Sequence, residues 1–393
     1  MSENFRSGRH FLQIPGPTNV PDRILRAMDH PTIDHRGPTF AALAAEVLEG
    51  LKPIFGTAGP VVVYPASGTG AWEAALVNTL SPGDRVLMAE TGQFSTLWVD
   101  LAKRLGFDVQ LLQGNWRRGA DPEAIEAALA EDREGEIKAV AVVHNETSTG
   151  VTSRIAEVRQ AIDRAGHGAL YMVDTISSLA SIDYCHDEWG VDVTVAGSQK
   201  GLMLPPGLSF NAISEKAQAA AKTSTMPKSY WDWSAMLDAN KASVFPYTPA
   251  TNLLYGLKEA IAMLQEEGLP NVFARHQRHA KATRAAVEAW GLEVLAEDPR
   301  EYSGSLTAVH LPEGHDADAL RALILERFDL SLGNGLGKLK GRVFRIGHLG
   351  WFNDLMLSGT LSGVEMGLDL FGLPSKASGM LAAQDVLKEP VSR

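Results

Sequence analysis

Short apolar runs alternate with helix-like segments over most of the chain. Val61–Tyr64 predicts a buried strand, and the helical spacing of residues 70–80 follows it. Residues 139–143 are apolar at every position, which is typical of a strand covered on both faces. We expect further strands at 85–89, 107–112, 169–173 and 191–196, and further helices at 95–105 and 121–131. Because strands that alternate with helices usually pair in parallel, this part predicts an α/β fold with a mainly parallel sheet.

The C-terminal part has a different order of elements. Two helical patterns, at 253–267 and 271–290, precede a predicted α+β unit with strands at 306–311 and 343–346 and helices at 317–328 and 355–370. A chain of 393 residues fits two domains, since domains usually run to ~100–200 residues. We expect an N-terminal arm (1–20), a large domain (21–265) and a small C-terminal domain (266–393).

Composition and charge exclude several classes of partner. Lys plus Arg number 36 against 47 Asp plus Glu, a net charge of −11, which argues against a nucleic-acid or anionic-membrane partner. The single cysteine, Cys185, excludes an internal disulfide framework, and we interpret it as a small buried residue. The sequence shows neither a signal-peptide pattern nor an apolar stretch of about 18 residues, so we expect a cytoplasmic enzyme.

The most informative residue is Lys200, which follows the apolar strand at 191–196. Taken alone, it is most simply a surface lysine. A partly buried lysine, however, has a lowered pKa and becomes nucleophilic, as Schiff-base chemistry requires. Asp174 ends the neighbouring strand at 169–173. Pyridoxal phosphate needs both groups, because the lysine holds its aldehyde and the carboxylate keeps its pyridine nitrogen protonated.

A phosphate cradle is the third requirement of that cofactor. Residues 66–70, between a strand and a helix, offer glycines for close backbone approach, two hydroxyls and a helix N-terminus. Small-residue turns of this kind are common, so the loop is weak evidence by itself. The competing dinucleotide fingerprint fails, because residues 68–73 lack its third glycine.

Together these motifs resemble the class V aminotransferases of the fold type I pyridoxal-phosphate enzymes, specifically the alanine/serine–glyoxylate group and most closely its bacterial serine–glyoxylate members. The resemblance covers nearly the whole chain and implies a large domain with a mainly parallel, mixed sheet between helices, plus a smaller α+β domain. The matching motifs are Ile14-Pro15-Gly16-Pro17-Thr18, Asp34-His35-Arg36, Ser67-Gly68-Thr69-Gly70, His144-Asn145-Glu146-Thr147-Ser148-Thr149-Gly150, Val173-Asp174, Gly197-Ser198-Gln199-Lys200-Gly201, Tyr247-Thr248-Pro249 and Phe344-Arg345-Ile346-Gly347-His348-Leu349-Gly350.

The resemblance implies a role for each cofactor residue. Lys200 would bond the cofactor aldehyde and then move the substrate proton, while Asp174 would pair with the pyridine nitrogen. Phe94 would stack on the ring, and Thr147 would contact the cofactor near its phenolic oxygen. The phosphate would be bound by Ser67, Gly68, Thr69 and Gln199.

The resemblance also implies how substrate and a second subunit take part. Arg345 would clamp the substrate carboxylate, with Gly16 in the same substrate-binding set. Thr248 would reach the phosphate of a neighbouring subunit, which implies a homodimer or a higher homo-oligomer with shared sites. Phe245 stands where relatives often have tyrosine, and Tyr247 is a candidate substitute. Residues 175–178 read Thr-Ile-Ser-Ser where close relatives often have Gly-Val-Ser-Ser.

We expect transamination between L-serine and glyoxylate by a ping-pong mechanism. Alanine and aspartate remain open as amino donors, and a polar wall from residues 34–36 would favour aspartate if it added a second cation. The alternatives are a class V lyase or desulfurase, a nicotinamide oxidoreductase and a non-enzymatic binding module. The placement of Cys185 argues against the desulfurase.

Three other features have simpler interpretations. The glycines and basic residues between Gly333 and Arg342 predict a flexible loop that could close over an anionic substrate. Residues 230–233, Tyr-Trp-Asp-Trp, are rich in aromatic side chains that could line a site or a dimer contact, and we expect them to pack. His276 and His279 share a helix face without further ligands, so we expect packing or surface roles and no metal.

Overall fold

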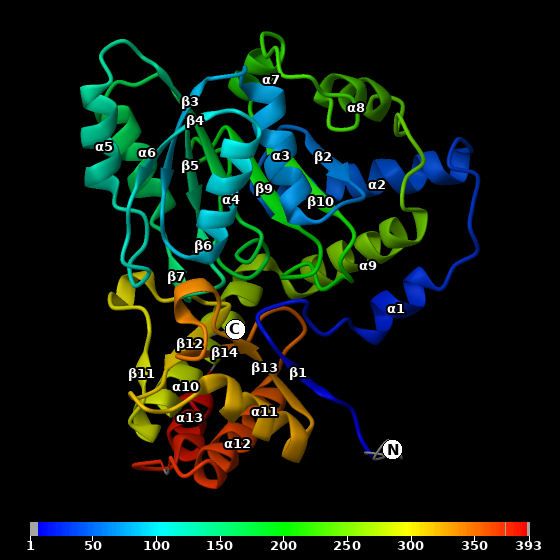
Figure 1. Cartoon of the computed structure of the whole chain (residues 1–393). Coiled ribbons are helices and arrows are strands. Elements are labelled where there is room, and N and C mark those ends of the chain that lie inside the picture. Colours follow the sequence, from blue (N-terminus) through cyan, green and yellow to red (C-terminus); the bar gives the residue numbers. More distant parts are fainter. Residues whose placement is uncertain (1–6, 374, 391–393) are drawn as a thin grey trace.

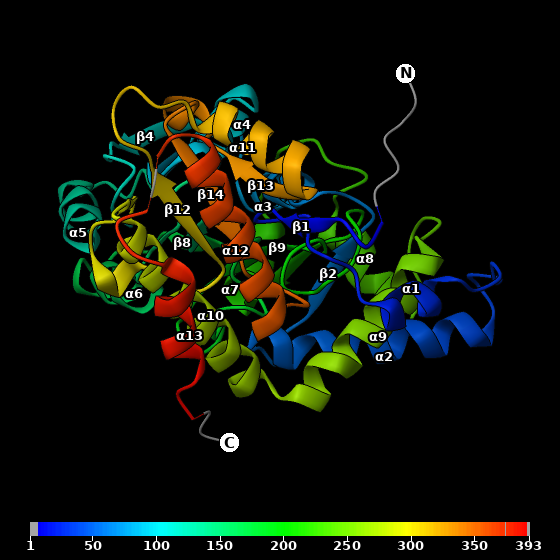
Figure 2. The same cartoon turned by 90° about the horizontal axis from the view of Figure 1, so that it is seen from below.

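The computed structural model describes residues 7–373 and 375–390. In this part of the chain, a large sheet and a small sheet each carry their own helices (Figures 1 and 2). The helices are α1 (Asp22–Met28), α2 (Pro38–Phe55), α3 (Gly68–Thr79), α4 (Gln93–Arg104), α5 (Pro122–Glu131), α6 (Ile155–Arg164), α7 (Glu215–Ala221), α8 (Trp233–Asn240), α9 (Thr251–Glu267), α10 (Leu269–Trp290), α11 (Ala317–Phe328), α12 (Asp354–Leu370) and α13 (Gly379–Leu387), with 3₁₀ turns η1 (Pro299–Glu301) and η2 (Gly337–Leu339). The strands are β1 (Phe11–Gln13), β2 (Val61–Tyr64), β3 (Arg85–Ala89), β4 (Asp108–Leu112), β5 (Ile137–Val143), β6 (Asn145–Glu146), β7 (Val151–Thr152), β8 (Leu170–Asp174), β9 (Val193–Gly197), β10 (Ser209–Ile213), β11 (Glu293–Val294), β12 (Leu306–His310), β13 (Leu330–Asn334) and β14 (Val343–Gly347).

The large sheet has the strand order β2-β10-β9-β8-β5-β3-β4. β10 pairs antiparallel with β2 and with β9, whereas all other neighbours pair in parallel. β2 therefore runs in the same direction as β9. The carboxyl ends of β2, β9, β8, β5 and β3 consequently meet at one edge of the sheet, where open α/β sheets place their ligand sites.

Strand side chains alternate between two apolar cores. Val61 and Val63 of β2 join the core shared with α2, α5, α6 and α9. Val62 and Tyr64 join the core on the other face, where α3 and α4 pack (Figure 1). Since both faces are covered, the strands are apolar at nearly every position, and the interpretation of residues 139–143 as a doubly covered strand is confirmed.

The small sheet has the order β1-β13-β14-β12-β11. Phe11 lies in register with Leu330, so the segment expected as an N-terminal arm supplies an edge strand parallel to β13. The remaining pairs are antiparallel, and α10 to α13 bury their apolar faces around this sheet. The prediction of a loop at Gly333 was wrong, because β1 and β14 pair with this segment on either side and hold it as β13.

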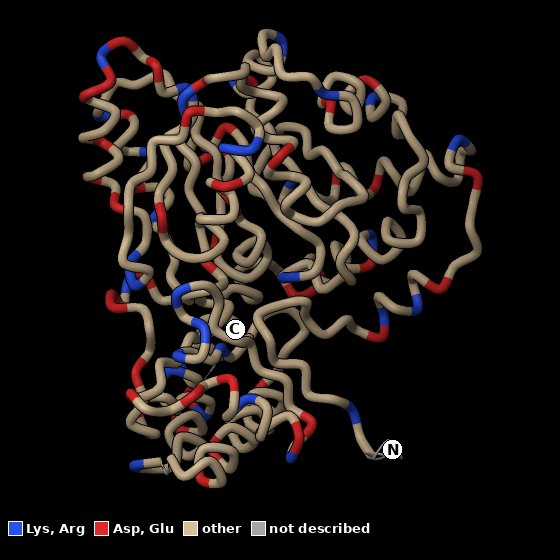
Figure 3. The backbone as a smooth tube through the Cα atoms, in the orientation of Figure 1, with Lys and Arg blue, Asp and Glu red and all other residues tan. Residues whose placement is uncertain are grey.

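The predicted α/β fold is confirmed, with a mixed sheet between helices and a second α+β unit. α3 begins at Gly68, two residues before the expected start at Gly70, and the sequence pattern missed β10, α7, α8 and α13. Lys, Arg, Asp and Glu lie mostly on the outer helices and loops (Figure 3). Among the described residues, no helix is both long enough and apolar enough to cross a membrane. The domain boundaries stay predictions.

Candidate active site

A cavity of about 220 Å³ opens at the carboxyl edge of the large sheet. Its lining residues lie at or after the ends of five strands of the large sheet, and Gly16 and Pro17 come from the segment after β1. The residues that line it are Gly16, Pro17, Ser67, Gly68, Thr69, Trp72, Phe94, Asn145, Thr147, Asp174, Ile176, Ser177, Gln199 and Lys200. The structure therefore brings together most of the residues predicted to hold the cofactor.

Lys200 lies three residues beyond β9 and is 7% exposed. Its Nζ donates a hydrogen bond to the Pro15 carbonyl oxygen. Burial and the nearby Arg345 charge lower its pKa to about 7, against the attraction of Asp174 and Glu146. Such an amine is neutral in a large fraction of molecules at neutral pH, which makes it nucleophilic.

Asp174 is the last residue of β8 and is 3% exposed. Its Oδ2 accepts a hydrogen bond from Trp72 Nε1 at 2.9 Å, and its Oδ1 accepts one from the Ile176 amide at 2.6 Å. Burial raises the pKa of Asp174 to about 7, although both hydrogen bonds oppose the shift. A cation in the cavity would restore its negative charge.

The other end of the cavity is built around the start of α3. Ser67 occupies the N-cap position without capping the helix through its side chain, so the first N–H groups lack acceptors within the helix. A Cβ at Gly68 would lie 2.8 Å from Ile176 Cγ1, so a larger residue there would have to displace the Ile176 side chain. The side-chain amide of Gln199 has a buried oxygen position without a partner in the described residues.

Five lining residues escaped the sequence-based prediction: Pro17, Trp72, Asn145, Ile176 and Ser177. Trp72 carried a usable signal, because it lies four residues after Gly68 and therefore on the same face of α3. Asn145 is fixed by hydrogen bonds to the Ser177 and Ser305 hydroxyls, at 2.7 and 3.0 Å, and such long-range partners leave no local pattern.

Arg345 borders the cavity without lining it. It lies in β14, is 6% exposed, and its Nη1 donates to the Thr147 carbonyl oxygen at 2.7 Å. Its Nε donates to the Asn334 carbonyl oxygen at 2.8 Å, and no carboxylate of the described residues forms an ion pair with it. Burial lowers its pKa to about 10, so the guanidinium stays charged at neutral pH and is available to an anion.

Two predicted groups lie away from the cavity. Thr248 is exposed in the segment between α8 and α9, and residues 34–36 lie in the loop between α1 and α2. Neither belongs to the residues that line the cavity. Their predicted roles, in which Thr248 serves a neighbouring subunit, stay predictions.

The remaining sequence features can also be located. His276 and His279 are buried, and no group of three or more His, Cys, Asp or Glu in the described residues could hold a metal ion. Cys185 is only partly buried, which corrects the expectation of a buried residue. Its neighbours Tyr184 and His186 are buried, but its own side chain lies at the edge of that packing.

The residues of the cavity fit pyridoxal phosphate. A helix start whose first N–H groups lack a side-chain cap suits a phosphate, the buried Asp174 suits a protonated ring nitrogen, and Lys200 suits an aldehyde. The buried Oε1 position of the Gln199 side-chain amide has no hydrogen-bond partner in the described residues, so a polar group bound in the cavity would satisfy it. The individual contacts predicted for each residue stay predictions.

Comparisons with known proteins agree with this chemistry. Residues 10–336 match the family model "Aminotransferase class-V". The chain is 50% identical to the serine–glyoxylate aminotransferase of Methylorubrum extorquens over 99% of its own length and 98% of the relative's. It is 46% identical to the L-aspartate–glyoxylate aminotransferase of Paracoccus denitrificans, over 95% and 94% of the two chains. The crystal structure of ureidoglycine–glyoxylate aminotransferase from Bacillus subtilis superimposes with a TM-score of 0.91 at 28% identity, covering 98% of this chain and 100% of that one.

Proposed function

The chain belongs to the class V aminotransferases, and we propose that it transfers the amino group of L-serine to glyoxylate, giving hydroxypyruvate and glycine by a ping-pong mechanism. The observation that carries the proposal is the buried Lys200 at the carboxyl edge of the large sheet, where the charges of Asp174 and Arg345 both act on its amine. Relatives of similar length that are named serine–glyoxylate aminotransferases support the choice of substrates.

Each residue has a distinct task in this proposal. Pyridoxal phosphate, when bound, supplies the electron sink that stabilises negative charge at the substrate α-carbon. Lys200 would hold the cofactor between turnovers, and its amine would take the proton from the substrate α-carbon and pass it to the cofactor carbon that keeps the amino group. Asp174 keeps a proton on the ring nitrogen, and Ser67, Gly68, Thr69 and Gln199 bind the phosphate.

Arg345 would bind the substrate carboxylate through the planar donors of its guanidinium. No described carboxylate forms an ion pair with it, so it offers a site for one carboxylate, and a donor with a single carboxylate matches that site best. Serine and alanine meet this condition. Aspartate needs a second cation, and Arg36 of a second subunit would supply one. Together with the L-aspartate–glyoxylate relative, this makes aspartate the alternative donor.

A desulfurase is disfavoured by the cysteine. Cys185 does not line the cavity, and burial together with Asp183 and Glu188 raises the pKa of its thiol, which keeps it protonated. The similarity to solved cysteine desulfurases, at 16% identity, concerns the fold alone.

Purified protein loaded with pyridoxal phosphate should be yellow. Its visible band should fall when serine is added and return with glyoxylate, and a donor panel of serine, alanine and aspartate would rank the donors. Lys200→Ala should abolish the band and the turnover while leaving the circular dichroism spectrum unchanged, whereas Lys241→Ala, on the exposed end of α8, should change neither. A wild-type protein that never acquires the band would end the proposal.

We propose further that the enzyme is a cytoplasmic homodimer in which Thr248 serves the partner subunit's site. The support is its exposure and its separation from the cavity of its own chain. Mixing Lys200→Ala with Thr248→Ala protein gives mixed dimers with one doubly altered site and one intact site. Activity above that of either parent is therefore expected, light scattering should report two subunits, and cell fractionation tests the location.

A further inference from the structure

Glu146 is a buried acid beside the cavity that the proposed reaction does not use. It is the second residue of β6, directly before Thr147, and it is 0% exposed. No Lys, Arg or His side chain of the described residues forms an ion pair with it. A buried carboxylate without a paired cation is costly unless hydrogen bonds satisfy it.

Four hydrogen bonds satisfy this carboxylate. Oε1 accepts from the Ser148 amide at 3.1 Å, the Ser148 hydroxyl at 2.6 Å and the Phe94 amide at 3.2 Å. Oε2 accepts from the Ser95 amide at 3.0 Å. Phe94 and Ser95 belong to the first turn of α4, whose N–H groups lack helical acceptors and favour a negative charge. Glu146 therefore caps α4 from another part of the chain.

The capping geometry leaves no spare room. A Cβ at Gly92 would lie 2.6 Å from Glu146 Cδ, so this close approach requires glycine. The Ser148 hydroxyl also accepts from the Gln93 amide at 2.9 Å, which ties the start of α4 to the segment after β6. Glu146 thus connects two residues that line the cavity, Phe94 through its amide and Thr147 as the next residue in the chain.

Glu146 also balances the charges around the cavity. Lys200 and Arg345 are buried cations without an ion-pair partner in the described residues, and Asp174 and Glu146 are the acids that face them. The Glu146 charge raises the pKa of both cations against the effect of burial, while Arg321 behind Arg345 acts in the opposite sense on the guanidinium. Arg345 in turn donates to the carbonyl oxygen of Thr147, the next residue.

We propose that Glu146 is a positioning residue for the transamination: its carboxylate sets Phe94 and Thr147 against the cofactor and provides the counter-charge for Lys200 and Arg345. The inference rests on the proposed function. Its role is indirect, because Glu146 does not line the cavity and acts through the residues that do.

Glu146→Gln removes the charge and replaces one acceptor with an amide that cannot accept a hydrogen bond. In the holoenzyme, the visible band of the lysine-bound cofactor should change with pH. Its midpoint should be about one pH unit lower in Glu146→Gln than in the wild type, since a lost opposite charge disfavours the protonated form. The dissociation constant for pyridoxal phosphate should rise by ~10-fold, which corresponds to about 1.4 kcal/mol.

Two further variants separate positioning from general destabilisation. Glu301→Gln alters another buried carboxylate, 2% exposed, which accepts from two arginines and the Gly119 amide away from the cavity. It should lower the melting temperature and leave the band midpoint and cofactor affinity unchanged. Glu146→Asp keeps the charge with a shorter reach, so the midpoint should stay while the affinity weakens.

The outcomes distinguish this inference from the proposed function. If the wild-type protein shows the visible band and Glu146→Gln has the same band midpoint and the same affinity for pyridoxal phosphate, the inference about Glu146 is overturned and the proposed function stands. If Glu146→Gln does not fold, wild-type affinity in Glu146→Asp overturns it instead. Absence of any band in wild-type protein would count against the transaminase itself.

Discussion

At the scale of single residues, Lys200 and Asp174 show what the cavity is built for. Burial moves the pKa of each to about 7, downward for the amine and upward for the carboxylate, because a low-dielectric environment disfavours both charges. A bound group that supplies a cation would therefore stabilise the charged form of the acid, and an electrophile on the same group would react with the neutral amine. This is the complement that a pyridoxal ring offers.

Asp174→Asn tests this interpretation in the cofactor-free protein. Because the pKa of Asp174 is raised to about 7 on folding, its contribution to stability is complete below its unfolded value of 3.8 and is lost as pH rises through 7. The difference in unfolding free energy, variant minus wild type, should therefore be about 1–4 kcal/mol more favourable to the variant at pH 8 than at pH 5. Urea unfolding at the two pH values measures this difference, since the altered hydrogen bonds contribute equally at both.

The same variant should lose activity when loaded with cofactor. Turnover should fall by about 10²–10³-fold, the usual cost of removing one preorganised electrostatic group. An equal stability change at pH 5 and pH 8 would show that Asp174 is not buried as a charge-sensitive acid.

Sequence reasoning located the residues that follow strand ends and missed those that act from elsewhere. Lys200 and Asp174 were found because an ionisable residue directly after an apolar strand is conspicuous. The sequence assigned Glu146 no role beyond its place in a motif. Its four hydrogen-bond donors come from its own loop and from α4, about fifty residues earlier, so no local pattern marks it. Its partners become visible only when the chain is folded.

At the scale of elements, β10 shows why a strand was missed. Its residues are all buried, yet Ser209 and Asn211 gave it a polar pattern that resembles a loop. The Asn211 amide donates to the Ala71 carbonyl oxygen of α3 at 3.2 Å and accepts from Trp233 Nε1 of α8 at 3.4 Å. The polar side chain is satisfied by two helices that the local sequence cannot reveal.

Asn211→Ala should destabilise the protein by about 1–3 kcal/mol, because the buried Trp233 Nε1 loses its acceptor. Urea unfolding measures the change. In a Trp233→Phe background the donor is already absent, so the same substitution should cost less. Equal costs in both backgrounds would mean that this long hydrogen bond contributes nothing to stability.

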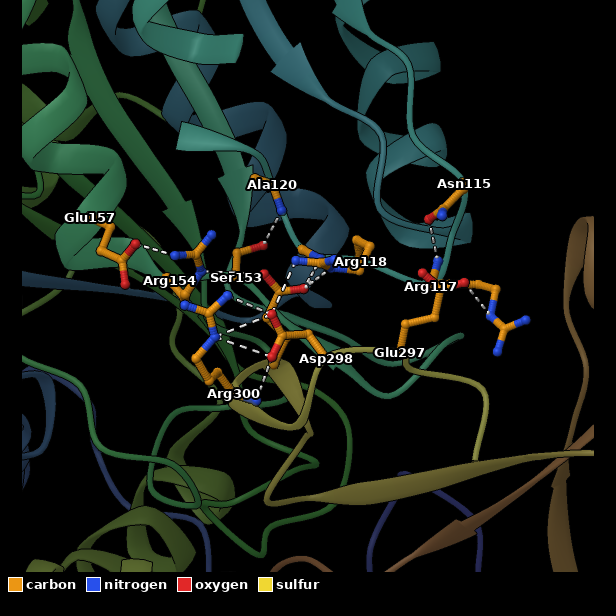
Figure 4. A network of polar contacts seen from close by, with 12 residues as sticks. Asn115, Arg117, Arg118, Ala120, Ser153, Arg154, Glu157, Glu297, Asp298 and Arg300 are labelled. Atoms are coloured by element: carbon orange, nitrogen blue, oxygen red, sulfur yellow. Dashed lines mark hydrogen bonds and ion pairs between the residues drawn. The ribbon is translucent and has the colours of Figure 1, made fainter. Parts of the chain in front are cut away.

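At the scale of the whole molecule, side-chain contacts join the part of the chain that carries the large sheet to the part that carries the small sheet. Arg118 and Arg154 of the large-sheet half reach Asp298 and Glu301 of the other half, and Figure 4 shows Arg118 and Arg300 converging on Asp298. The small sheet in turn brings Arg345 on β14 to Thr147. The sequence predicted two units, but this contact between them depends on side chains far apart in the chain.

Acid should unfold the molecule through histidines buried in both halves. Burial lowers the pKa of His144 and His276 to about 3 and that of His279 to about 4, although Asp354 opposes the last shift. The unfolded chain binds protons at these sites below about pH 6.5, while the folded chain does not. The unfolding free energy should therefore fall as pH drops from about 6.5 towards 4, with each histidine adding up to ~1.4 kcal/mol per pH unit.

His144→Phe isolates one of these contributions. His144 packs against Tyr184 and Trp189, its Nδ1 has no hydrogen-bond partner in the described residues, and burial alone causes its shift. A phenyl ring fits this aromatic surrounding and cannot take up a proton, so the slope of unfolding free energy against pH should shrink by up to ~1.4 kcal/mol per unit. His30→Asn on the exposed surface is the matched control, and the same slope in both variants would place acid sensitivity elsewhere.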